Sequence, residues 1–519
     1  MEAMEIAAQP AVYATFWALI PPIVAIALAL ITKEVYSSLF VGILVGGLFY
    51  SGFAFEGTVV HIFKDGMISV LSDSWNVGSL IFLVILGAMV ALMNKAGGSA
   101  AFGRWASEHI KTRVGAQLAT VALGVLIFID DYFNCLTVGS VMRPVTDKHN
   151  ISRAKLSYLI DATAAPVCII APISSWAAAV TGFVEGEDGL SLFIRAIPYN
   201  FYALLTIVMM IGITLLDADF GPMAVHERNA KNGDIYTTSG RPYANDESVH
   251  MVKDKGKVID LIIPIIALIS CCVIGMIYTG GFFSGESFIT AFSNSDASLG
   301  LVYGSFFGFI ITVVFYIVRR ALSFKECMAS LPEGFKAMVP AIMIVTFAWT
   351  LKAMTDSLGA AEFVAGAMEH VAGGLMNLLP AIIFLVGCGL AFATGTSWGT
   401  FGILIPIVVA VFSGSNAELM IISISACMAG AVCGDHCSPI SDTTIMASAG
   451  GQCDHVNHVS TQLPYALTVA AISFVTYIVA GFVQSAWISL PVGIALTVLV
   501  LLVIRKKNGA GQVRRPFEK

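Results

Sequence analysis

Apolar runs of about 20 residues, long enough to cross a bilayer as helices, recur almost from one end of the 519-residue chain to the other. Charged residues make up only 12% of the chain and hydrophobic residues 57%, whereas soluble chains carry about 25% charged residues. This composition excludes a soluble enzyme, a disordered chain and a nucleic-acid-binding protein. The sequence predicts an all-α polytopic membrane protein embedded in the lipid bilayer.

The chain resembles itself at a nearly constant offset. NKAGGSAAFGRWASEHI at 94–110 aligns without gaps on TDSLGAAEFVAGAMEHV at 355–371, and IPYNFYAL at 197–204 resembles LPYALTVA at 463–470. Matches that keep a common order indicate an internal repeat. We therefore predict a first repeat at 1–216, a linker at 217–257, a second repeat at 258–482, and an extra C-terminal helix with a tail at 483–519.

The positive charges give the expected orientation. Lys and Arg flank the apolar stretch 114–142 on both sides, whereas the equivalent stretch 377–412 has none at either end. A re-entrant hairpin at 114–142 places both clusters in the cytoplasm, as the positive-inside rule favours. A hairpin at 377–412 would then enter from outside, which makes the two repeats inverted in topology.

The resulting membrane topology has about 11 full transmembrane helices in addition to these two re-entrant hairpins. The amino terminus lies outside a bacterial-type inner membrane, and the carboxyl terminus and the linker lie in the cytoplasm. Segments 98–110 and 359–373 are expected to be amphipathic helices in the membrane interface. The expected spans are 12–31, 36–54, 77–95, 154–183, 197–216, 258–278, 299–318, 337–355, 418–448, 460–482 and 486–504.

Polar residues at the hairpin tips are functional candidates because ionisable groups are costly in lipid. The first tip, FIDDYFN at 128–134, contains Asp130, Asp131 and Asn134. An Asp can simply cap a helix, but two adjacent carboxylates repel each other unless a cation or a proton lies between them. The second tip, AFATGTSWGTF at 391–401, offers the neutral hydroxyls of Thr396 and Ser397.

Two spans, 154–183 and 418–448, are expected to be broken helices because proline removes a helix hydrogen bond. Irregular backbone at membrane depth occurs where it lines a cavity or is buried in protein. The candidate ion or substrate ligands in these two spans are Asp161, Thr163 and Ser174 in the first, and Asp435, Ser438, Asp442 and Thr443 in the second.

Carboxylates together with neutral oxygens are suited to a hard monovalent ion. We predict a sodium site at Asp130, Asp131, Thr396, Ser397 and Asp435, with no transition metal and no catalytic residue. His436 is expected to respond to pH or to be a buried structural histidine. The segment QCDHVNH at 452–458 is expected to be a solvated cytoplasmic loop, with a pH-sensing cluster as the alternative.

Four segments of this sequence resemble the NhaC-type sodium/proton antiporter family of the ion-transporter superfamily: FIDDYFN, GTSWGTFGILIPI at 395–407, GDHCSPISDTTI at 434–445 and CDHVNHVSTQLPYA at 453–466. The resemblance implies an elevator-type secondary carrier that works as a homodimer. It implies no cofactor, because sodium and protons are the transported ions. Members of this family are also assigned to malate/lactate exchange and to amino-acid uptake.

The leading hypothesis for function is sodium/proton antiport, in which both ions compete for the same buried carboxylates. The alternative is a sodium-coupled transporter or exchanger of a small organic solute, an amino acid or a carboxylate, whose pocket Trp176 or Trp398 would shape. An intramembrane enzyme is not expected, because the chain contains no HExxH and the glycines before Asp435 do not match the aspartyl-protease pattern.

Overall fold

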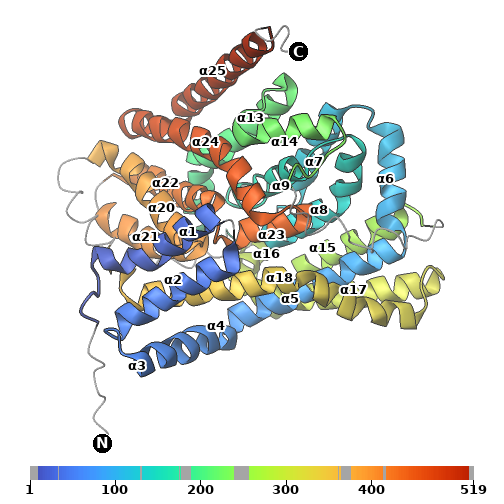
Figure 1. Cartoon of the computed structure of the whole chain (residues 1–519), viewed down its shortest axis with the longest axis horizontal. Coiled ribbons are helices and arrows are strands. Elements are labelled where there is room, and N and C mark those ends of the chain that lie inside the picture. The colour runs from blue at the N-terminus through green and yellow to red at the C-terminus, as the bar shows by residue number, and fades with distance from the viewer. Residues whose placement is uncertain are drawn as a thin grey trace, which may run out of the picture.

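The chain is described by a computed structural model that covers residues 10–32, 34–128, 131–172, 174, 176, 180, 189–238, 256–360, 362–363, 376–412 and 416–513. Every regular element within these ranges is a helix, and no strand occurs in them. The predicted all-α class is therefore confirmed. Figure 1 shows the helices stacked in several layers, with α25 extending away from the body toward the C-terminus.

The helices up to residue 231 are α1 Ile20–Thr32, α2 Val35–Tyr50, α3 Phe55–Val60, α4 Ser69–Ser72, α5 Ser74–Lys95, α6 Gly98–His109, α7 Arg113–Leu126, α8 Asp131–Lys148, α9 Arg153–Asp161, α10 Ala165–Cys168, α12 Gly189–Ala196, α13 Phe201–Leu216 and α14 Gly221–Lys231. Three shorter segments are η1 Phe16–Leu19, the π-helix η2 His61–Ile68 and η3 Ile197–Tyr199.

The helices from residue 259 onward are α15 Ile259–Thr279, α16 Phe288–Ser293, α17 Ala297–Val318, α18 Phe324–Ser357, α20 Leu379–Thr394, α21 Ser397–Phe412, α22 Ala417–Cys437, α23 Asp442–Gly451, α24 His455–Val483 and α25 Ala486–Val513. The 3-10 segments η5 Phe282–Ser284 and η6 Met376–Leu378 accompany them.

Seven helices in the described part of the chain are long and apolar enough to cross a membrane. An eighth span is obtained if the bent pair Ser191–Tyr199 and Phe201–Leu216, which meet at 47°, is counted as one. The expected spans 12–31 and 36–54 correspond to shorter apolar helices, Phe16–Ala25 and Tyr36–Tyr50. The expected number of about 11 full spans therefore stays a prediction.

Two helical hairpins, each made of two helices and a short turn, lie where the re-entrant hairpins were predicted. Hairpin 1 consists of α7 and α8, and hairpin 2 of α20 and α21. Gly395 makes the turn of hairpin 2 with φ +67°, a left-handed conformation that costs glycine little. A Cβ at this position would lie 2.6 Å from the carbonyl oxygen of Ile440. The tip of hairpin 2 therefore packs closely against the α22–α23 connection.

Both predicted broken helices are interrupted close to their prolines. The first consists of α9 and α10, with Pro166 in the first turn of α10, where its missing N–H is tolerated. The second consists of α22 and α23. Ser438 precedes Pro439 and has extended backbone, φ −87° and ψ 129°, because a following proline disfavours the helical region. Ser441 then accepts a hydrogen bond from the Thr444 amide and is the N-cap of α23.

Close helix pairs hold the bundle together. A Cβ on Gly434 of α22 would lie 2.2 Å from the carbonyl oxygen of Cys388 on α20, so only glycine allows these backbones to approach so closely. One large hydrophobic cluster centres on α13, α20, α22 and α24, and a second on α5, α8, α15 and α17. Both broken helices contribute buried side chains to each of the two clusters.

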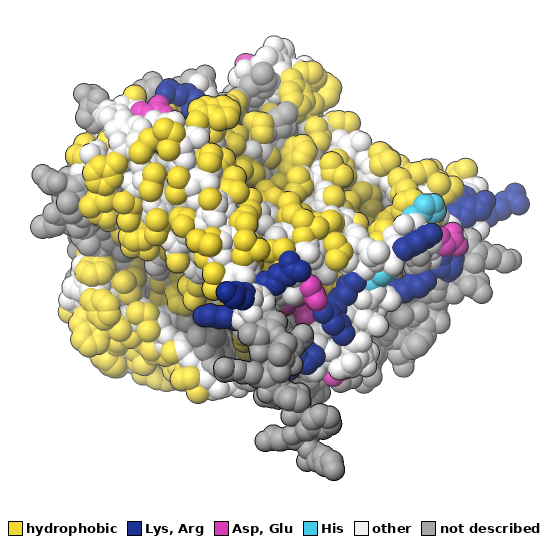
Figure 2. Space-filling view, turned by 90° about the horizontal axis from the view of Figure 1, so that it is seen from above, with side chains coloured by type: hydrophobic (Ala, Val, Ile, Leu, Met, Phe, Trp, Pro, Cys, Tyr) yellow, Lys and Arg dark blue, Asp and Glu magenta, His cyan; other side chains and the backbone are white. Residues whose placement is uncertain are grey.

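The surface agrees with a membrane protein. Figure 2 shows hydrophobic side chains over the left and upper centre of the visible face, while most of the visible Lys and Arg form a band from the lower centre to the right edge. Part of the 217–257 linker forms α14, while residues 239–255 lie outside the described part of the chain. The expected interfacial helix 98–110 corresponds to α6, whereas most of 359–373 falls outside the described residues. The division into two inverted repeats stays a prediction.

Candidate functional site

The tip of hairpin 1 places a carboxylate and an amide in the protein interior. Asp131 is the first residue of α8, is buried, and accepts a 3.1 Å hydrogen bond at Oδ2 from Thr443 Oγ1. Asp130, the other predicted carboxylate, lies outside the described residues. Hairpin 1 therefore contacts the start of α23.

Asn134 ties hairpin 1 to the first broken helix. Its Nδ2 lies 2.7 Å from the carbonyl oxygens of Gly124 and Ile127, and 3.0 Å from that of Thr163. The side chain was predicted to offer an oxygen to an ion. Its nitrogen instead holds three backbone segments together, while Oδ1 is buried and has no hydrogen-bond partner among the described residues.

The end of α22 brings Asp435 against hairpin 2. Ser397, the first residue of α21, donates to Asp435 Oδ2 at 2.8 Å. Asp435 Oδ1 is buried and has no hydrogen-bond partner among the described residues. A buried oxygen of this kind carries a desolvation cost that a bound cation or proton would relieve. Of the predicted sodium ligands, Ser397 and Asp435 are thus brought into direct contact.

A third buried carboxylate, Asp442, begins α23. It accepts hydrogen bonds from the Tyr132 hydroxyl and, at 2.8 Å, from the Thr443 amide. Thr443 Oγ1 lies 3.5 Å from Asp442 Oδ1 and also donates to Asp131. Neither Asp435 nor Asp442 forms an ion pair with a described Lys, Arg or His side chain.

The carboxylates do not converge on one point. Among the described residues, no three His, Cys, Asp or Glu side chains could hold one metal ion. Thr396, another predicted ligand, accepts a hydrogen bond from the Gly399 amide at 3.5 Å. Ser438 donates to the carbonyl of Phe392 at 2.9 Å and so fastens the α22–α23 connection to α20. A sodium ion here would therefore need neutral oxygens beside no more than two of these carboxylates.

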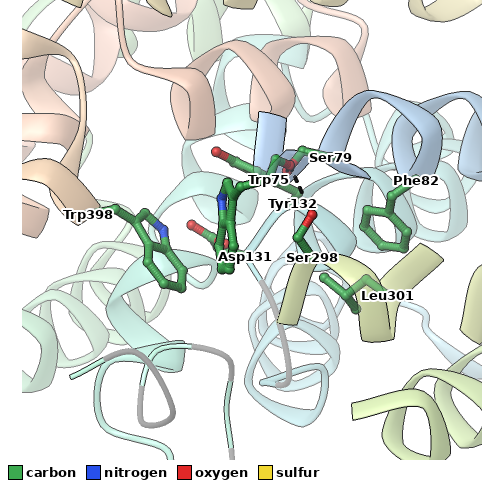
Figure 3. Close-up of a pocket in the computed structure, with 8 residues that line it drawn as sticks. All are labelled: Trp75, Ser79, Phe82, Asp131, Tyr132, Ser298, Leu301 and Trp398. Carbon is green, nitrogen blue, oxygen red and sulfur yellow. Dashed lines mark hydrogen bonds between the residues drawn. The ribbon is translucent and has the colours of Figure 1, made fainter. Parts of the chain in front are cut away.

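A cavity of about 20 Å³, room for about one water-sized species, lies beside Asp131. In Figure 3, Trp75 and Trp398 stand next to Asp131, and Ser298, Phe82 and Leu301 lie on the other side. The rings of Trp75 and Trp398 are 5.4 Å apart. The cavity is lined by Trp75, Ser79 and Phe82 of α5, Ser298 and Leu301 of α17, Asp131 and Tyr132 of α8, and Trp398 of α21.

Sequence reasoning missed Trp75, Ser298 and Tyr132. Trp75 and Ser298 lie near the beginnings of ordinary apolar helices, and nothing in their local sequence marks them. Tyr132 could have been found, since it adjoins Asp131 at the hairpin tip, but its contact with Asp442 depends on how hairpin 1 and α23 pack.

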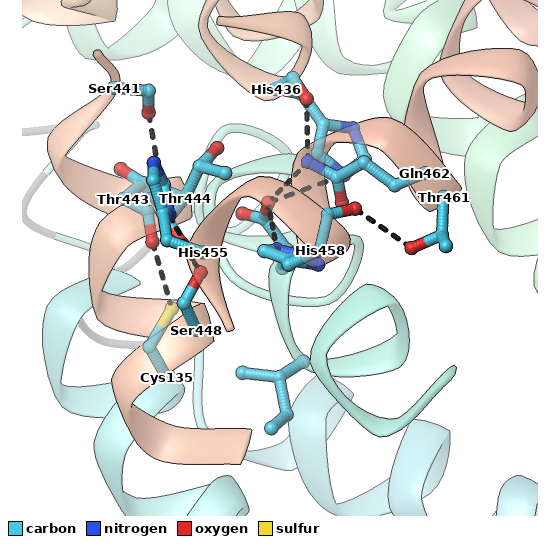
Figure 4. Close-up of polar contacts among 12 residues, drawn as sticks. Cys135, His436, Ser441, Thr443, Thr444, Ser448, His455, His458, Thr461 and Gln462 are labelled. Atoms are coloured by element: carbon cyan, nitrogen blue, oxygen red, sulfur yellow. Dashed lines mark hydrogen bonds and ion pairs between the residues drawn. The ribbon is translucent and has the colours of Figure 1, made fainter. Parts of the chain in front are cut away.

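Asp161, the last residue of α9, lies in a separate polar cluster. Its Oδ2 is 2.8 Å from Gln462 Nε2, 3.1 Å from His458 Nε2 and 3.8 Å from His436 Nε2. Figure 4 shows His436, His458 and Gln462 turned toward one another, apart from the group around Thr443 and His455. The expectation of a solvated loop at 452–458 is wrong for His458, which is fully buried because α24 begins at His455.

The remaining predicted hydroxyls are engaged locally. Thr163 Oγ1 donates to its own helix, at 2.7 Å from the carbonyl of Leu159. Ser174 Oγ lies 2.8 Å from the carbonyl of Cys168. Neither hydroxyl hydrogen-bonds to Asp161 or Asp435 in the described part of the chain, so their predicted role as ligands stays a prediction.

A match to a known protein family shows which family the chain belongs to. The model of the Na+/H+ antiporter family matches residues 167–482, a range that contains hairpin 2, the second broken helix and His458. This chain belongs to the Na+/H+ antiporter family. The resemblance found in the sequence is thereby confirmed, as is a multi-span transporter of the membrane.

Relatives of this antiporter-family chain carry different names. An uncharacterized protein of Haemophilus influenzae is 38% identical over 506 residues, which is 94% of each chain. The malate-2H(+)/Na(+)-lactate antiporter of Bacillus subtilis is 28% identical over 173 residues, 32% of this chain and 35% of that one. The arginine/ornithine antiporter ArcD of Halobacterium salinarum is 26% identical over 224 residues, 42% of this chain and 41% of that one.

Proposed function

We propose that this chain exchanges sodium ions for protons across a bacterial-type inner membrane by alternating access. Asp435 carries the proposal: one of its carboxylate oxygens is buried and has no hydrogen-bond partner within the geometric limits among the described residues, while the other accepts from Ser397. An uncompensated buried carboxylate binds a cation or a proton in preference to remaining bare. Competition between the two ions for the buried carboxylates would make the exchange obligatory.

The oxygens around Asp435 suit sodium better than a divalent ion. Ser397 supplies a hydroxyl, and the α22–α23 connection exposes backbone near the same point. One carboxylate with neutral oxygens balances a single positive charge. The proposal extends to the elevator-type movement and the homodimer that the family resemblance implies, and to the inverted repeats that the sequence predicts.

A sodium gradient across liposomes tests the exchange. Purified protein is reconstituted with a pH dye inside, and sodium is added outside without an organic solute. We expect sodium-dependent proton counterflow from the wild type and its loss in Asp435→Asn, which keeps the shape of the side chain. Asp296→Asn is the matched control, because Asp296 is exposed and caps α17, and asparagine caps as well. A flat wild-type trace from correctly inserted protein contradicts sodium/proton exchange.

Sodium-coupled movement of a small organic solute is the second candidate. It is favoured by relatives that are named for malate, lactate, arginine and ornithine. In the same liposomes, uptake of a labelled amino acid or carboxylate only in the presence of a sodium gradient would support this function instead.

A further inference from the structure

Asp161 is held by nitrogen donors rather than by oxygens. Gln462 Nε2 and His458 Nε2 both lie within hydrogen-bond distance of Oδ2, so this nitrogen of His458 carries a proton. All these side chains are buried. A sodium ion placed at Oδ2 would face two N–H groups, which repel a cation. Asp161 is therefore a poor sodium ligand in this arrangement, although its charge still requires compensation.

Lysine and arginine do not provide that compensation. In the described residues, Asp161 forms ion pairs only with His436 and His458. Arg153 and Lys155 at the start of α9 pair with Asp147 and Asp219 instead, and Arg113 of α7 pairs with Glu227. The titratable groups that act on Asp161 through space are Tyr158 on α9, Asp435, His436 and Cys437 on α22, and His455 and His458 on α24.

We infer that Asp161 and His458 form a proton-binding site of this carrier, separate from the carboxylate that faces the cation. The inference rests on the proposed function, which it deepens by giving each ion its own residues. One proton added to the pair changes its charge from −1 to zero, whichever of the two side chains carries it. Gln462 is a positioning residue, because its amide joins Asp161 Oδ2 to the His436 carbonyl at 2.7 Å.

The structure connects the two sites through shared backbone. His436, whose carbonyl Gln462 holds, directly follows Asp435 in the last turn of α22. On the other side, the Thr163 carbonyl just after α9 accepts from Asn134 at the tip of hairpin 1. Movement of the α22 end or of hairpin 1 on cation binding would therefore shift the surroundings of Asp161. This linkage allows sodium at one site to expel the proton from the other.

Sodium binding measured across pH tests the assignment. Wild-type protein in detergent is titrated with sodium chloride by calorimetry in buffers of different ionisation enthalpy, which counts the protons released. We expect the apparent sodium affinity to fall by about tenfold per pH unit below the pH at which the pair titrates. Asp161→Asn mimics the protonated pair, so it should bind sodium weakly at every pH and release no proton.

His458→Gln should behave in the opposite way. This substitution removes the imidazole and leaves Asp161 charged. At neutral pH the variant should therefore bind sodium within about threefold of the affinity that the wild type shows at alkaline pH. Sodium binding to the variant should release no proton. A merely structural role would lower the affinity in both variants and keep the slope. His226→Gln, a histidine of the linker helix, is the control and should keep the wild-type profile. A wild-type pH profile in both Asp161→Asn and His458→Gln overturns the inference.

Failure of the proposed function would be visible separately. If the wild type binds no sodium at any pH, sodium/proton exchange is wrong, and the pair is then judged by acid–base titration without sodium. The wild type should take up one proton more than the double variant Asp161→Asn/His458→Gln over the titration range of the pair. Equal uptake by the two proteins contradicts the proton site.

Discussion

Asn134 contacts three carbonyl oxygens through a single nitrogen, at Gly124, Ile127 and Thr163. The carbonyls of Ile127 and Thr163 lie just past the ends of α7 and α9, where the helices offer them no donor. Gly124 lies in the last turn of α7. In a membrane interior, water does not satisfy such groups either. One amide therefore fixes how hairpin 1 sits on the first broken helix.

Replacing Asn134 by aspartate should damage the protein more than replacing it by alanine. Alanine removes the donor, which costs about 1–3 kcal/mol, whereas aspartate also turns a carboxylate toward carbonyl oxygens. We expect the melting temperature in detergent to fall in the order wild type, Asn134→Ala, Asn134→Asp. Asn232→Asp, at the exposed end of α14, should leave it unchanged. A milder effect of aspartate than of alanine would contradict this role of the nitrogen.

Gly395→Ala should destabilise the tip of hairpin 2. The left-handed backbone costs an alanine about 1–2 kcal/mol, and its Cβ would meet the Ile440 carbonyl at 2.6 Å. We expect a lower melting temperature and slower transport. Gly389→Ala on the same helix is the matched control, since a Cβ there meets nothing within 4 Å, and alanine should be neutral or stabilise by up to about 1 kcal/mol. Equal effects of the two variants would show that the turn imposes no strain.

At the scale of elements, polar contacts attach the linker helix α14 to the first residues of both α7 and α9. Glu227 forms an ion pair with Arg113 and accepts from the Ser152 amide at 2.9 Å. Asp219 pairs with the buried Lys155 and accepts from the Tyr465 hydroxyl. Residues 217–238 therefore cover the ends of hairpin 1, the first broken helix and α24 as one body. The described part of the linker thus forms a cap over these helices.

The stability contributed by the Glu227 carboxyl should fall as pH rises. Burial and the charge of Asp219 raise the pKa of Glu227 above its ordinary 4.5, although Lys155 and Arg113 act in the opposite direction. The folded protein therefore holds the Glu227 proton more tightly than the unfolded chain. Its contribution is fully present below pH 4.5 and is lost as pH rises through the raised pKa.

Thermal unfolding of the wild type and of Glu227→Gln across this pH range checks the prediction. The difference in melting temperature between the two proteins should change as the pH passes above 4.5, because the glutamine does not titrate. Glu286→Gln, an exposed residue between α15 and α16, serves as the control and should follow the wild type. Parallel curves for the wild type and Glu227→Gln would contradict the raised pKa.

For the whole molecule, sidedness is the property that the charges predict. Seven described helices are suited to cross a membrane, and exposed hydrophobic side chains cover much of their surface (Figure 2). The excess of Lys and Arg on short connections then sets the orientation. We therefore expect the α15–α17 connection outside and the end of α25 in the cytoplasm.

Labelling of introduced cysteines in intact cells tests this orientation. Glu286→Cys should react with a membrane-impermeant maleimide from outside, whereas Lys507→Cys should react only after the cells are opened. Both positions are exposed, and the native cysteines in the described residues are buried or partly buried. Reaction of Lys507→Cys in intact cells would reverse the predicted topology.

The sequence by itself determined where helices form and where they break. The length of an apolar run, a proline after Ser438 and a glycine at 395 act over a few residues, so the hairpin turns and both broken helices could be located without a structure. The same local context predicted that Asp131, Asp161, Asp435 and Asp442 are buried. These features depend on backbone sterics and on the cost of polar groups in lipid.

Only the tertiary structure decided which side chains meet. Asp161 lies about 300 residues before His458 and Gln462 in the chain, and Tyr132 is as far from Asp442, so no spacing could pair them. The sequence treated all the carboxylates as one set of ligands and the segment at 452–458 as a solvated loop. Helix packing instead placed His458 beside Asp161 and Ser397 beside Asp435, because contacts between distant helices depend on the fit of whole surfaces rather than on local pattern.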